Sequence, residues 1–127
     1  MEELIARITN RTGVDAATAQ TAIGHILAFL QKEGPADDVA KLLATMPGSE
    51  AAVAQANAGD DGGGLMGMLG GMGGGVMVLG QKLMSAGVPM NQMQPLGHEL
   101  FAHARESVGE DTIGRIVGSI PGLSQFV

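Results

Sequence analysis

The sequence contains no cysteine, tryptophan or tyrosine, and only three phenylalanines among its 127 residues. Because cysteine is absent, disulfide bonds, thiolate metal sites and cysteine nucleophiles are excluded. The shortage of aromatic side chains leaves few platforms on which bases could stack. A chain of this length buries roughly two-thirds of its unfolded surface, so a hydrophobic core alone can stabilise one domain.

Positive charge is also scarce. The 7 lysine and arginine residues are outnumbered by 13 aspartate and glutamate residues, which gives a formal net charge of −6. Proteins that bind nucleic acids carry a basic patch that neutralises phosphates. We therefore expect no nucleic acid among the partners.

Neither a signal peptide nor a membrane span is recognisable. The start, Met-Glu-Glu-Leu-Ile-Ala-Arg, lacks a basic region followed by an apolar stretch. The uncharged stretch 62–81 is half glycine, whereas membrane helices consist mainly of larger apolar residues. We expect a cytoplasmic protein, or a periplasmic one if a signal was removed. We expect no transmembrane helix, with weak contact to a membrane surface as an open alternative.

The sequence resembles itself at a spacing of 74 residues, which predicts a duplicated helical unit. Gly24-His25 also reappears as Gly97-His98, one residue out of this register. The predicted division is repeat unit one at 1–57, a Gly/Met-rich connector at 58–75 and repeat unit two at 76–127, all within one domain. The matching segments are Gly13-Val14 with Gly87-Val88, Asp37 with Asp111, Val39 with Ile113, Lys41-Leu42-Leu43 with Arg115-Ile116-Val117, and Thr45-Met46-Pro47-Gly48 with Ser119-Ile120-Pro121-Gly122.

Apolar residues at three- and four-residue spacing predict helices throughout both units. We expect Asp15 and Asn91 to cap the long helices, Gly34 to end the first of them, and Pro95 to fall in the first turn of the second. No segment alternates with the period of a strand. The predicted fold class is all-α, a small helical bundle of two pseudo-symmetric units.

Shorter helices are expected at 2–11, 49–57 and 76–86, and one short helix in each unit should end at a Pro-Gly step. The apolar stripes should pack on each other in one shared core. The residues predicted for this core are Leu27, Leu30, Leu42, Leu43, Leu100, Phe101, Ile116 and Val117.

This arrangement resembles a bacterial family. A Gly-Val opening before a long Ala-rich helix, a short helix ending in Met-Pro-Gly or Ile-Pro-Gly, and a Gly-rich middle are similar to the VcgC/VcgE-like proteins of unknown function. The chain also looks like a second uncharacterised bacterial domain, in which paired helical units end in a Leu-Pro step. The resemblance implies a small all-helical domain and carries over no catalytic or binding residues to this sequence.

The Gly/Met-rich segment is the least ordinary part of the sequence. Ten of the 17 residues 59–75 are glycine, and seven of the nine methionines lie between Met66 and Met93. Three interpretations stay open: a flexible connector, an apolar contact surface, and a copper(I) site, because thioethers favour that ion. The residues expected in a contact surface are Leu65, Met66, Met68, Leu69, Met72, Val76 and Met77. The residues that could hold copper(I) are Met66, Met68 and Met72.

Enzyme chemistry has little support in the sequence. His98 and His103 are five residues apart, whereas a chelating pair on a helix is three or four apart. Acidic residues gather at expected helix starts, where the helix dipole favours them. We expect neither catalysis nor a resident cofactor. The predicted function is a structural or protein-interaction module that self-associates or binds a protein partner, and the alternative is a carrier of a small ligand, a lipid or copper(I).

Overall fold

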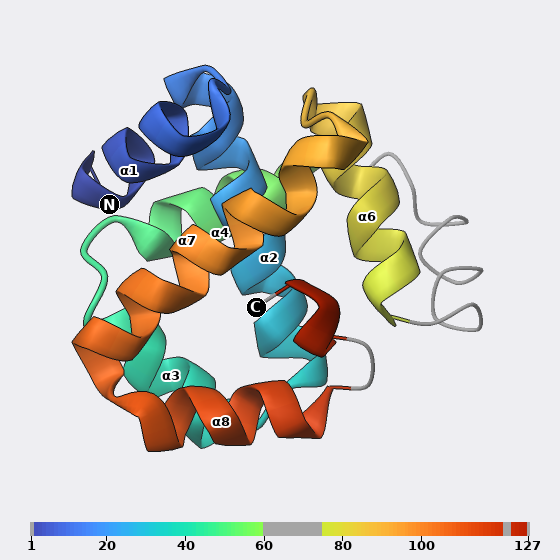
Figure 1. Cartoon of the computed structure of the whole chain (residues 1–127). Helices are drawn as coiled ribbons and strands as arrows, with labels where there is room; N and C mark the ends of the chain where they lie inside the picture. The colour runs from blue at the N-terminus through green and yellow to red at the C-terminus, as the bar shows by residue number, and fades with distance from the viewer. Residues whose placement is uncertain (1, 60–74, 121–122, 127) are drawn as a thin grey trace.

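The computed structural model describes residues 2–59, 75–120 and 123–126, and all regular structure in these ranges is helical (Figure 1). The predicted all-α class is therefore confirmed for the described residues. The helices are α1 (Glu2–Thr12), α2 (Ala16–Glu33), α3 (Ala36–Ala44), α4 (Ser49–Gly59), α6 (Gly75–Ala86), α7 (Met90–Val108), α8 (Glu110–Ser119) and the 3-10 turn η2 (Leu123–Phe126). We call 2–59 the first half and the described residues of 75–126 the second half.

Helix ends largely follow the sequence signals. Asp15 is the N-cap of α2, as expected, although its carboxylate makes no capping hydrogen bond. The prediction of Asn91 as the cap of α7 is wrong, because the N-cap is Pro89. Pro89 has ψ 148°, which is extended and not helical backbone, so the helix begins with Met90. Pro95 consequently lies in the second turn of α7 and not in the first.

The two halves cross over each other. Helix α1 packs against α7 of the other half, and α6 packs against α2. In Figure 1, α7 runs across the middle of the molecule, while α3 and α8 lie side by side at one edge. The first half therefore covers helices of the second, and the second covers helices of the first.

One continuous core results from this crossing. Leu27, Leu30, Leu100 and Phe101 are at most 1% exposed and belong to a single apolar cluster. Of the other predicted core residues, Leu42 and Ile116 are also buried, whereas Leu43 and Val117 are only partly buried. Leu43 and Val117 each follow a buried residue directly and thus point about 100° around the helix from it.

Two glycines turn the chain from one helix into the next. Gly13 links α1 to α2 with φ 76°, and Gly87 links α6 to α7 with φ 109°. Residues other than glycine rarely adopt this left-handed backbone conformation. The residues that follow, Val14 and Val88, are both buried. The recurring Gly-Val pair therefore marks the same kind of turn in each half.

Helix α4 lies very close to α2. A Cβ atom on Gly24 would overlap the backbone carbonyl group of Ala52, so only glycine permits this approach. Ala52, Val53 and Ala56 form the buried side of α4. In the second half, the segment after α8 is described only as the short η2 turn, which packs on α7 and α8.

None of the described helices combines the length and the apolar character needed to cross a lipid bilayer.

Candidate interaction surface

Most of the predicted contact surface falls outside the described residues. Leu65, Met66, Met68, Leu69 and Met72 all lie within 60–74, as do the three candidate copper(I) ligands. Val76 and Met77 belong to the first turn of α6, but their side chains are outside the described set. Both the contact surface and the copper(I) site therefore stay predictions.

Two other methionines are exposed at the corner between α6 and α7. Met84, in the last turn of α6, is 51% exposed, and Met90, the first residue of α7, is 74% exposed. Among the described residues, they are the large apolar side chains that are more than half exposed. We call Met84 and Met90, with the exposed Pro89 between them, the methionine corner. Neither residue was among the contact residues predicted from the sequence, because methionine spacing alone does not distinguish the exposed Met84 and Met90 from the buried Met93.

A polar groove borders the methionine corner. It encloses about 330 Å³ and lies between the α1–α2 turn and the α6–α7 turn. Asp15 is the charged residue among those that line it. The hydroxyl of Thr12 is engaged locally, since it donates to the Ile8 carbonyl at 2.7 Å and accepts from the Val14 amide at 3.2 Å. The lining residues are Thr12, Gly13, Val14, Asp15, Thr18, Gly87, Pro89, Asn91 and Gln92.

The chemistry of this groove is that of hydrogen bonding. Hydroxyl and amide groups can donate to or accept from a polar backbone or side chain. The described lining residues do not include a histidine or lysine that could act as a base beside a nucleophile. The groove thus supplies polar contacts next to the apolar side chains of the methionine corner.

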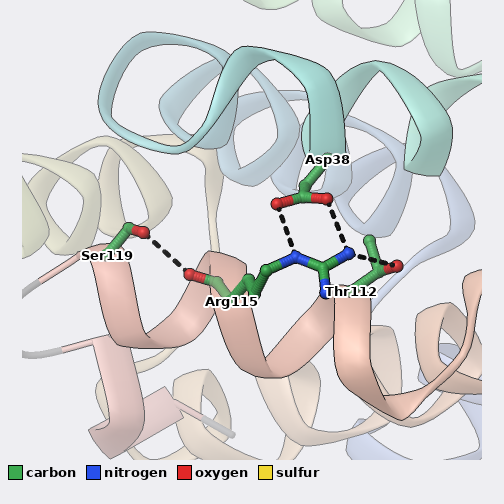
Figure 2. Close-up of polar contacts among 4 residues, drawn as sticks. All are labelled: Asp38, Thr112, Arg115 and Ser119. Carbon is green, nitrogen blue, oxygen red and sulfur yellow. Dashed lines mark hydrogen bonds and ion pairs between the residues drawn. The ribbon is translucent and has the colours of Figure 1, made fainter.

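An ion pair joins α3 to α8 across the two halves (Figure 2). The Arg115 guanidinium donates from Nε and Nη2 to the two carboxylate oxygens of Asp38, each at 3.0 Å. Nη2 also lies 3.3 Å from the Thr112 hydroxyl, and Ser119 donates to the Arg115 carbonyl oxygen. The hydrogen bonds from Arg115 lower the pKa of Asp38, and desolvation of the carboxylate opposes this effect.

A second charged contact joins α1 to α7. Arg7 donates to Glu106 at 2.8 Å and lies 3.6 Å from Glu99, and Arg11 lies 3.8 Å from Glu99. The hydrogen bond to Glu106 is the main reason that the pKa of Arg7 is raised. The sequence did not predict these pairings, because the paired residues are 88 or more residues apart in the chain.

The histidines do not form a metal centre in the part of the chain that the structure describes. No group of three or more histidine, aspartate or glutamate side chains there could hold an ion. The Nδ1 atom of His103 is buried and has no hydrogen-bond partner among the described residues. His98 is exposed, whereas His25 is half-buried.

The search for known relatives gives no match: no family model, curated protein or solved structure is significantly similar to this chain.

Proposed function

We propose that this protein is a non-enzymatic helical interaction module that self-associates through its methionine corner. The observation that carries the proposal is the position of Met84 and Met90. Large apolar side chains exposed in the described residues occur together at one corner, beside a groove of polar groups. Such an apolar centre with a polar border is typical of protein–protein contact surfaces.

Methionine suits such a surface for a physical reason. Its side chain is unbranched and its sulfur is polarisable, so it adapts to partners of different shape. The contact residues predicted between Leu65 and Met77 are further apolar side chains that stand earlier in the sequence. Burial of these side chains in a complex would supply the driving force.

The module would consist of two related units, and the burial pattern supports this duplication. Buried residues of α2 and α7 correspond at the 74-residue spacing, and so do those of α3 and α8. In that register His25 corresponds to Glu99 and not to His98. The buried pairs are Ala19 with Met93, Ala22 with Leu96, Ile26 with Leu100, Leu27 with Phe101, Leu30 with Ala104, Val39 with Ile113, Leu42 with Ile116 and Met46 with Ile120.

The duplicated unit also agrees with the resemblance to the VcgC/VcgE-like proteins, which stays a proposal. Helix, Gly-Val turn, long helix and short helix follow one another in both halves. The methionine corner itself is not duplicated. At the 74-residue spacing, Met84 and Met90 correspond to Asn10 and Ala16, which are small or polar.

Solution mass over a range of concentrations tests the proposed function. Size-exclusion chromatography with light scattering should show a mass that rises from monomer towards dimer. Met84→Lys with Met90→Lys should keep the protein monomeric, because lysine places charge in the contact. The control carries Ala40→Lys and Ala44→Lys at exposed positions of α3, which does not line the groove, and should associate like the unchanged protein. A monomer at all concentrations, or equal association of both double variants, would contradict the proposal.

A further inference from the structure

The apolar faces of the two halves are covered by each other. Leu4 and Ile8 of α1 are fully buried in a helix that packs on α7. Leu79 and Leu83 of α6 are at most 2% exposed in a helix that packs on α2. Neither half encloses these side chains alone, so each half presents a large apolar surface that the other half must cover.

Charged pairs also connect the two halves. Arg7 with Glu106, Arg11 with Glu99 and Arg115 with Asp38 each join one residue of the first half to one of the second. Opposite charges at fixed positions favour the correct partner and disfavour others. At the 74-residue spacing Asp38 corresponds to Thr112, so pairing two second halves would leave Arg115 without a carboxylate opposite it.

We propose that a second copy of this chain completes the same fold by exchanging halves. In this dimer, α1–α4 of one copy pack on α6–η2 of the other, with the same buried residues and the same ion pairs as in the monomer. The halves are joined covalently only by residues 60–74. Exchange of identical elements is a low-cost route to a dimer because it needs no new interface.

The protein concentration determines whether the monomer or the dimer with exchanged halves is populated. A covalent connector holds its two ends at an effective concentration in about the millimolar range. The monomer therefore dominates in dilute solution, and the exchanged dimer becomes populated when chains refold at concentrations approaching that range. Variants that weaken pairing within one chain, but restore it between two chains, shift the balance further towards the dimer.

The Asp38–Arg115 pair provides such variants. Asp38→Arg places two arginines against each other within one chain, and Arg115→Glu places two carboxylates against each other. When the two variants are unfolded in urea, mixed and refolded together, a half-exchanged dimer restores opposite charges at both α3–α8 contacts. We expect the mixture to give a dimer fraction several-fold above that of either variant refolded alone, as measured by light scattering.

The control is one chain with both changes, Asp38→Arg and Arg115→Glu, which restores the pair within the monomer. It should fold, as judged by circular dichroism, and show no excess of dimer. If the single variants do not fold alone but fold as a dimer when mixed, the proposal is equally supported. A mixture that stays monomeric, or one that stays unfolded while the doubly changed chain folds, would overturn it.

This inference does not rest on the methionine corner, and the two proposals can fail separately. Adding Met84→Lys and Met90→Lys to both charge variants should leave the dimer of the mixture intact. Association that is equal in each variant and in the mixture would point to another surface and would contradict exchange.

Deletion of residues 60–74 is a second test. It leaves no residues to turn the chain from α4 into α6, so half exchange predicts a dimer. A contact surface confined to the Gly/Met-rich segment predicts a monomer instead. If this variant fails to fold, the mixture of charge variants decides.

Discussion

The two halves bury apolar side chains at corresponding positions but use them differently. Helix α2 carries small residues at its crossing with α4, where Gly24 meets the backbone of Ala52. At the 74-residue spacing, Gly24 corresponds to the exposed His98 of α7, and Leu27 corresponds to the bulkier buried Phe101. The difference shows that one pattern of buried positions accommodates both a close helix crossing and a core filled by bulky side chains.

The largest expected effect comes from the close crossing. Gly24→Ala adds a Cβ that overlaps the backbone of Ala52, and such overpacking costs typically about 1–3 kcal/mol of unfolding free energy. The matched control is Gly114→Ala in α8, where a Cβ would meet nothing within 4 Å. Alanine there should stabilise the protein by about 0.5–1 kcal/mol, because glycine weakens a helix interior.

Urea unfolding followed by circular dichroism measures both changes. Equal effects of the two substitutions would mean that α4 does not lie tightly against α2. The comparison of the halves would then lose its main structural difference.

The sequence predicts the helices well and their pairing poorly. Most helix positions follow from local signals, which act within a few residues. These signals are the spacing of apolar residues, Asp15, Gly34 and the Pro-Gly steps. The crossing of α1 onto α7 and of α6 onto α2 depends on contacts between distant residues, which one sequence does not encode as a local pattern. For the same reason, the sequence did not predict that Asp38 pairs with Arg115.

The exposed Met84 and Met90 were not among the contact residues predicted from the sequence. Methionine enrichment indicated the region from Met66 onwards, but exposure distinguishes Met84 and Met90 from Met93, which is 7% exposed. That distinction arises from the tertiary packing of α6 and α7. The helical period alone places these residues on a face without saying what covers that face.

A smaller effect is expected from pH at the contact between α3 and α8. The Arg115 guanidinium lowers the pKa of Asp38 in the folded protein. An aspartate has a pKa of about 3.9 in an unfolded chain. The stabilisation by this pair is therefore fully present above that pH and is lost as the pH falls through the lower folded value.

Asp38→Asn removes this dependence. The variant should be less stable than the unchanged protein at neutral pH, and the gap should narrow in acid, below about pH 4. Urea unfolding at a series of pH values measures this gap. Asp37→Asn, which removes an exposed carboxylate from the same turn of α3, is the control and should lower the stability less than Asp38→Asn does. A gap for Asp38→Asn that stays constant into acid would show that Asp38 does not act through its charge.

The central claim is that the two halves share one core, and native-state hydrogen exchange tests it most directly. Amide protons around Leu27 in α2 and around Phe101 in α7 should be protected by the same free energy, equal to that of global unfolding in urea. Low urea concentrations should lower the free energy of exchange in α2 and in α7 in parallel. Exchange in one half at a clearly smaller free energy, while the other half stays protected, would show two separately folded units and contradict the account.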